Sequence, residues 1–363
     1  MKRFNLLFLL IVILSSCKPS FNPDPATVKK ADGAIRMLYQ FSSPIFKNKG
    51  EYSKIDDSYM LPWEATAANT NEQLLSAVDS LKANAKLKLV SGNISGSSLN
   101  LKTNFPANIK DVGDIFELNF SKSNIKNASG DLLEFRKTGS VSLGSNSVSG
   151  FKNGKNYAYD WVTINASFGQ KDKQSVEGAA GSGTFMAKFI GDYKHTKVSA
   201  KDIGKKITLD GASFEVADIF DNKMILSPKE GAKFNSRNIK FVNMDDNGHK
   251  IAAVSFAEMS ERKKKDPSLE FSMSGLGSGT TTLNEKALEV FKKNPNISED
   301  DFVSALLDSY SRVFSSDDPR EAGLKYLGPK LTVLHAAGPI QNIYLYTPVY
   351  SVKKEFEVPL SAK

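Results

Sequence analysis

The sequence predicts a mainly β protein of the α+β class, built of two β-rich, sandwich-like domains. Short runs in which apolar and polar residues alternate recur between turn signals, as expected for half-buried strands. Helical spacing replaces this alternation in two places, near residues 70–85 and within residues 258–328. The residues from 18 to 363 are enough for two domains of about 150 residues each.

The first residues of the chain have the pattern of an export signal. Lys2 and Arg3 precede an apolar segment at 6–14, which is shorter than the roughly 20 apolar residues that span a bilayer. Leu-Ser-Ser-Cys follows at 14–17 and contains the only cysteine of the chain, Cys17. This arrangement resembles the lipobox of bacterial lipoproteins.

The resemblance implies that the chain is cleaved before Cys17 and anchored by lipid. Diacylglycerol would be attached to the cysteine sulfur and a further acyl chain, such as palmitate, to its new amine, and several acyl chains anchor stably. Lys18 occupies the position at which aspartate signals retention in the inner membrane, and no acidic run follows it. The resemblance therefore implies an outer-membrane anchor, with the periplasmic face favoured over the cell surface. An ordinary signal peptide that happens to end in a cysteine is the alternative.

Residues 18–33 are expected to form a tether between the lipid and the first domain, because three prolines fall within 18–26 without an apolar period. The first domain is expected at 34–178. Its first strand is predicted from four apolar residues at every second position, which would share one face. These residues are Ile35, Met37, Tyr39 and Phe41.

A helix near 70–85 is predicted within the first domain. Thr70 is suitable as its N-cap, and an apolar stripe follows at helical spacing. The stripe consists of Leu74, Leu75, Val78 and Leu81. Strands are expected afterwards at 87–90, 98–101, 115–120 and 157–164, with Asn153-Gly154 as a hairpin turn before the last.

The second domain is expected at 184–363, beyond a run of small residues at 178–183. A helical insertion is predicted near 258–328, where Ser298 caps one helix and acidic residues follow in its first turn. The short motif Val-x-Asp-Ile-Phe occurs at 112–116 and at 216–220, which is compatible with two related β modules or with coincidence. Strands are predicted at 184–190, 206–209, 212–219, 223–226, 239–242, 250–256, 331–334, 341–346 and 352–358.

Charge and cysteine content argue against several classes of protein. The formal net charge is +8, of which Lys2 and Arg3 would be removed with the signal. The one dense basic run, at 262–265, has no interleaved aromatic residues, so no nucleic-acid partner is expected. With Cys17 acylated, the folded part has no thiol for a disulfide or a thiolate metal site, and no cofactor is expected.

The chain contains no recognisable catalytic motif. A Gly-x-Ser-x-Gly elbow is absent, and the three histidines, His195, His249 and His335, have no second ligand at a metal-binding spacing. Asp-Asp-Asn-Gly at 245–248 lacks the closing glutamate of a calcium loop and is expected to form a turn. Neither a metal nor a catalytic residue is predicted. Because pairs of carboxylates are numerous, a hydrolase of the two-carboxylate kind stays open.

Aromatic residues are the predicted ligand-binding residues. Tyr157, Tyr159 and Trp161 share one strand face, and Tyr344 and Tyr346 share another. Exposed aromatic rows stack on sugar rings or anchor a protein partner, although packing in the core is the plainer alternative. The sequence thus predicts a lipid-anchored envelope protein with a non-catalytic binding role, for a glycan, a peptide or an envelope protein. A polysaccharide hydrolase and an inhibitor or immunity-type lipoprotein are the alternatives.

Overall fold

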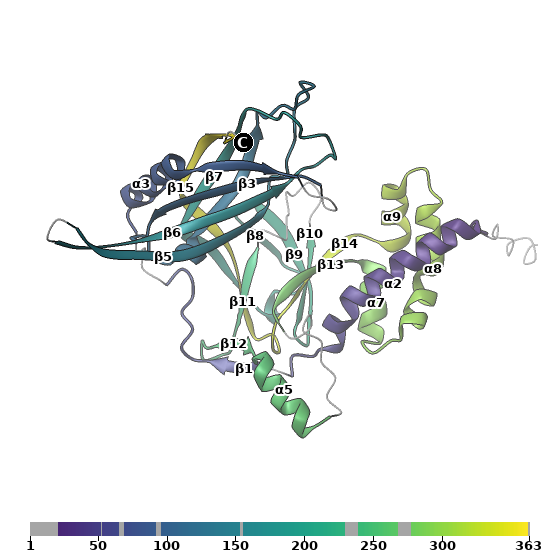
Figure 1. Ribbon diagram of the computed structural model, residues 1–363. Helices are drawn as coiled ribbons and strands as arrows, with labels where there is room; N and C mark the ends of the chain where they lie inside the picture. The colour runs from purple at the N-terminus through teal and green to yellow at the C-terminus, as the bar shows by residue number, and fades with distance from the viewer. Residues whose placement is uncertain are drawn as a thin grey trace, which may run out of the picture. The chain divides into compact units, whose positions relative to one another are not determined.

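A computed structural model shows how the elements are arranged in space (Figure 1). The structure describes residues 21–51, 53–64, 69–91, 96–152, 155–228, 239–267 and 277–361. The chain forms two compact units, neither of which is one continuous segment. The described residues before Met60, together with His195–Tyr346, form the three-layer unit. Met60–Lys194 and Thr347–Lys363 belong to the other, the sandwich unit.

Helices form one layer of the three-layer unit (Figure 1). The side chains of Asp24, Asn284, Ser298 and Asp318 each accept hydrogen bonds from the free backbone N–H groups at a helix start. The four helices that follow these caps are α2 (Pro25–Lys47), α7 (Glu285–Lys293), α8 (Glu299–Phe314) and α9 (Pro319–Leu327). The same unit contains α5 (Phe256–Lys265) and the short η1 (Ala200–Asp202).

An antiparallel five-stranded sheet in the order β13-β14-β10-β9-β8 forms the middle layer. Its strands are β8 (Lys206–Leu209), β9 (Ala212–Phe220), β10 (Lys223–Pro228), β13 (Gly279–Asn284) and β14 (Lys330–His335). The third layer has the order β1-β12-β11-β15, and only the first residues of β15 belong to this unit. Its strands are β1 (Ser53–Asp56), β11 (Lys240–Met244), β12 (Lys250–Ala253) and β15 (Asn342–Pro359).

The middle sheet separates two apolar cores, because successive side chains of a strand point to opposite faces. In β10, Ile225 packs with the helices, whereas its neighbour Met224 packs in the core shared with the third layer. The helical core contains Phe46, Phe291 and Phe302, whose rings stack with centroids 4.6 and 4.5 Å apart. Ring stacking of this kind adds about 1 kcal/mol to the burial of each pair.

The sandwich unit contains two facing sheets. One has the order β2-β3-β6-β5, and the other consists of β4, β7 and the later residues of β15. The strands are β2 (Lys86–Val90), β3 (Ser98–Pro106), β4 (Phe116–Ser123), β5 (Ser140–Lys152), β6 (Lys155–Gly169) and β7 (Ser182–Val198). The helices α3 (Asn71–Asn84) and α4 (Val112–Ile115) belong to the same unit.

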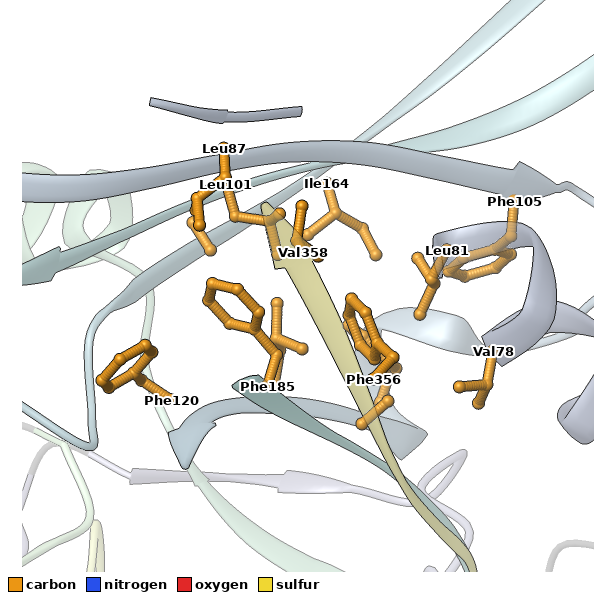
Figure 2. Packing of buried hydrophobic residues seen from close by; sticks show 14 of the residues in the cluster. Val78, Leu81, Leu87, Leu101, Phe105, Phe120, Ile164, Phe185, Phe356 and Val358 are labelled. Atoms are coloured by element: carbon orange, nitrogen blue, oxygen red, sulfur yellow. The ribbon is translucent and has the colours of Figure 1, made fainter. Parts of the chain in front are cut away.

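The core of the sandwich unit lies between its two sheets (Figure 2). Leu87, Leu101 and Ile164 come from one sheet and point toward Phe185 and Phe356 from the other. All five side chains are buried, and full burial of such a side chain contributes about 1.5–3 kcal/mol. Since alternate residues of each strand fill this core, the residues between them must lie on the outer faces.

The mainly β, α+β fold class is confirmed, and so are the strongest capping predictions. Thr70 caps α3 in a capping box with Gln73, and Ser298 caps α8. β11 and β12 form the predicted hairpin around 245–248. β5 and β6 pair up to Lys152 and Lys155, so they flank the predicted Asn153-Gly154 turn, which itself lies outside the described residues.

The strand predicted over 35–41 is wrong, because these residues form part of α2. Ile35 and Tyr39 are four residues apart, so they share the buried face of the helix, whereas Met37 and Phe41 are exposed. Four apolar residues at every second position fit a strand, but Ile35 and Tyr39 by themselves also fit a helix, which begins at Pro25 after the Asp24 cap. The predicted tether at 18–33 therefore ends at Asp24 at the latest.

The predicted domain limits, 34–178 and 184–363, also differ from the observed units. They assume that each domain is one continuous stretch, whereas the chain passes from one unit to the other within β7 and again within β15. The matched motifs do not mark a structural repeat, because 112–115 form α4 while 216–220 belong to β9. β1, β5 and β13 were not predicted, and Leu75 of α3 is exposed.

Candidate ligand-binding site

The outer face of the β2-β3-β6-β5 sheet contains a hollow with a volume of about 620 Å³. Alternation within each strand builds it. Leu99 and Leu101 of β3 point into the core, so Asn100 and Lys102 point outward into the hollow. The polar side chains that line the hollow are Asn84, Lys86, Lys88, Asn100, Lys102, Asn104, Ser140, Ser142, Asn165 and Ser167. We refer to it as the basic hollow.

The strand register arranges these side chains in two rows across the sheet. One row runs from Lys86 through Lys102 and Asn165 to Ser142. The next row runs from Lys88 through Asn100 and Ser167 to Ser140. Each row therefore begins with ammonium groups and continues with amides and hydroxyls, which both donate and accept hydrogen bonds.

The basic hollow carries charge of one sign. Its three lysines form no ion pair with a described residue, and no aspartate or glutamate is among its described lining residues. Lys86 lies directly opposite Lys102, and like charges at facing positions of two strands destabilise a sheet by up to about 1 kcal/mol. Local rules are broken in this way mainly at functional sites. The arrangement suits an anionic ligand, which would relieve the repulsion.

Two of the predicted aromatic residues lie on the same face as the basic hollow. Tyr159, Trp161, Asn165 and Ser167 occupy alternate positions of β6 and share its outward side, since Ile164 points into the core. Tyr159 is 60% exposed, and Trp161 is half-buried. Trp161 stands four residues from Asn165, about 13 Å along the strand. The two aromatic residues thus lie on the same face of the sheet, farther along β6 than the polar rows.

The remaining predicted site residues are not part of this face. The side chain of Tyr157 and the whole of Cys17 lie outside the described residues. Tyr344 and Tyr346 are half-buried on β15 in the three-layer unit, where Lys197 Nζ lies 5.8 Å from the Tyr344 ring centroid. The two predicted aromatic groups therefore belong to different units.

The three-layer unit contains a buried polar cluster that holds loops together. Lys223 Nζ donates hydrogen bonds to the Asn48 carbonyl at 2.7 Å and to Asn222 Oδ1 at 2.5 Å, and burial lowers the pKa of this lysine to about 8. His335 lies opposite Lys223, and its Nδ1 donates to the Gly277 carbonyl at 3.1 Å. Burial lowers the pKa of His335 to about 4. Both side chains are buried, so we assign them a structural role.

The described residues give no support for metal binding. No group of three or more His, Cys, Asp or Glu side chains in this part of the chain could hold a metal ion. At 245–248, Asp245 Oδ1 accepts hydrogen bonds from the N–H groups of Asn247 and His249, at 2.9 and 2.7 Å, which makes the predicted turn. None of the helices within the described ranges is long and apolar enough to cross a membrane.

Sequence reasoning missed the lysines and amides of the basic hollow, although the signal was present. The sequence predicts alternating strands at 87–90 and 98–101, and their outward residues Lys88 and Asn100 line the hollow, whereas Lys86 and Lys102 lie just outside the predicted ranges. Comparison of the chain with protein-family models and with curated proteins gave no match.

Proposed function

We propose that this chain is a lipid-anchored protein of the bacterial cell envelope that binds an acidic glycan in the basic hollow without catalysing a reaction. The observation that carries the proposal is the facing pair Lys86 and Lys102 on a surface whose described lining has no carboxylate. Ammonium groups pair with the carboxylates or sulfates of such a glycan, while amides and hydroxyls match its hydroxyl groups.

The aromatic residues favour a glycan over an acidic peptide. Tyr159 and Trp161 continue the outward side of β6 beyond the hollow, where an extended chain of sugars could lie against their rings. A hydrolase would need two carboxylates beside the bound sugar, and the described lining supplies none. This distinction supports a binding role.

The test is a binding comparison with a polyuronate, a sulfated glycan, an uncharged glucan and polyglutamate. We expect the acidic glycans to bind and the glucan to bind weakly or not at all. A Trp161→Ala, Tyr159→Ala variant should lose part of the affinity for the glycans, about 1–3 kcal/mol, because stacking is removed. Equal binding of polyglutamate, unaffected by this variant, would replace the glycan with an acidic protein partner. Binding of none of the probes would refute the proposal.

The anchor is a separate part of the proposal, and it rests on the lipobox resemblance at 14–17. We propose acylation at Cys17 and attachment to the outer membrane, on its periplasmic face. Metabolic labelling with an alkyne fatty acid should mark the wild-type chain and leave the Cys17→Ser chain unmarked. Fractionation of the envelope should place the labelled chain with the outer membrane, and protease added to intact cells should leave it uncut.

A further inference from the structure

We propose that the exposed face of α2 lies on the anionic surface of the bilayer that holds the anchor. This inference rests on the lipid anchor of the proposed function and concerns a different surface from the basic hollow. At about 100° per residue, the exposed residues of α2 all fall on one side of the helix, in a stripe that also includes Pro25, Ala26 and Lys30. The stripe, here called the α2 face, contains Lys29, Gly33, Met37, Gln40, Phe41 and Lys47.

The α2 face is apolar in its middle and basic at its ends. Met37 and Phe41 are one turn apart and are 60% and 72% exposed. Lys29 and Lys47 lie toward the two ends of the helix. Asp32 is the only acidic residue of α2; it lies off this stripe and is paired with Arg36 at 3.0 Å. A helix with exposed apolar residues between lysines is typical of one that lies in the interface of an anionic bilayer.

The α2 face is expected to contact the bilayer because α2 follows Cys17 closely in the chain. Pro25, the first residue of α2, is the eighth residue after Cys17, so the intervening chain spans at most about 28 Å when fully extended. An acylated Cys17 would therefore keep this helix beside the membrane surface. The opposite face of α2 packs on α7 and α8 through Ile35, Tyr39 and Phe46, which leaves the α2 face outward from its own unit.

The contact can be tested with an environment-sensitive fluorophore on the full chain. Phe41→Cys is labelled with a nitrobenzoxadiazole dye, and Phe151→Cys, which replaces a phenylalanine of equal exposure (71%) in the sandwich unit, is the matched control. Both proteins are reconstituted into vesicles that contain phosphatidylglycerol and into vesicles of phosphatidylcholine alone. We expect blue-shifted emission, quenched by brominated lipid, at position 41 only and chiefly in the anionic vesicles.

Charge variants give a second measurement. Each lysine near an anionic surface contributes about 1 kcal/mol to the binding of that surface. Lys29→Gln with Lys47→Gln should therefore lower the ratio of label inserted in the bilayer to label exposed to water about 30-fold. The matched pair Lys201→Gln with Lys206→Gln, at η1 and β8, should leave that ratio unchanged. Equal emission at positions 41 and 151, or equal loss with both charge pairs, overturns the proposal.

Failure of the anchor can be distinguished from failure of the α2 face. Mass spectrometry of the N-terminal peptide from the same preparation shows whether Cys17 carries acyl chains. An acylated protein with water-like emission at position 41 refutes the α2 contact alone. A protein without acyl chains refutes the anchor, and with it the basis of this inference.

Discussion

The two outer faces of the sandwich unit differ in how their charged groups are paired. On the β4-β7-β15 side, Glu117 pairs with Lys188 at 3.8 Å and accepts a hydrogen bond from the Tyr350 hydroxyl at 2.7 Å. On the β2-β3-β6-β5 side, Lys86 faces Lys102 and no described lining residue is acidic. The two sheets that carry these faces enclose the same apolar core. The charged groups of the first face are paired with one another, whereas the proposed function would pair those of the second with a ligand of opposite charge.

Charge reversal should produce the largest difference in glycan affinity between variants of the two faces. A hydrogen-bonded contact with a charged group is worth about 1.5–3 kcal/mol, so Lys88→Glu with Lys102→Glu should weaken binding of an acidic glycan more than about 100-fold. Isothermal titration calorimetry measures this loss. Lys353→Glu, an exposed lysine on β15, is the control and should bind as the wild type does. A comparable loss in the control would remove the distinction between the faces.

The next largest effect is a difference in acid sensitivity between the two units. The pKa of His335 is lowered to about 4 in the folded chain, against 6.5 when unfolded, so between these pH values only the unfolded chain takes up the proton. The free energy of unfolding of the three-layer unit should therefore fall by roughly 3 kcal/mol as pH drops from 6.5 to 4. The protection factors of α8 amides, which are corrected for the slower intrinsic exchange at low pH, should fall over this range, while those of β3 in the sandwich unit change less.

The control for this pH effect is His335→Gln, which has no titrating ring. Between pH 6.5 and 4, the α8 protection factors of the variant should fall less than those of the wild type do. If the two chains respond identically, His335 is not the source of the acid sensitivity.

On the paired face, removal of one charge should destabilise the protein. Glu117→Gln loses the attraction to Lys188 and weakens the hydrogen bond from Tyr350, at a cost of about 1 kcal/mol, since this side chain is partly exposed. Urea unfolding followed by tryptophan fluorescence reports on the sandwich unit, because both tryptophans, Trp63 and Trp161, belong to it. An unchanged midpoint would mean that the pairing contributes nothing.

The smallest effect should have the opposite sign. Lys102→Gln removes the like-charge repulsion with Lys86 and should raise the free energy of unfolding by a few tenths of a kcal/mol. The same urea experiment measures it. If the variant is more stable but binds acidic glycans less tightly, Lys102 lowers the free energy of unfolding while it increases the affinity for the ligand. A destabilised variant would contradict the repulsion argument.

Much of the sandwich unit could be predicted from the sequence, because its buried residues alternate. The pattern at 98–101 is enough to place Leu99 and Leu101 inside and Asn100 outside. It does not reveal that Lys86 and Lys102 face each other, since register depends on which strands become neighbours. The sequence shows that both lysines are present, but it does not show that they are close in space.

Other elements were missed for equally physical reasons. β5, at 140–152, is rich in Ser and Gly and lacks a sustained apolar alternation, so its strand conformation depends on pairing along nearly the whole of β6. In α2, Ile35 and Tyr39 satisfy the spacing of a helix, while the intervening Met37 also satisfies that of a strand. Short apolar patterns cannot distinguish the two, and the cap at Asp24 carried the deciding information.

The division of β15 between the units also sets the order of events during synthesis. Val352, Phe356 and Val358 fill the core of the sandwich unit, yet they emerge from the ribosome after the whole of the three-layer unit's chain. The core between β3, β4 and β6 can therefore be completed only after the residues of β15 have been made. Such a chain needs protection from premature association, and premature termination before β15 would leave both units without a strand.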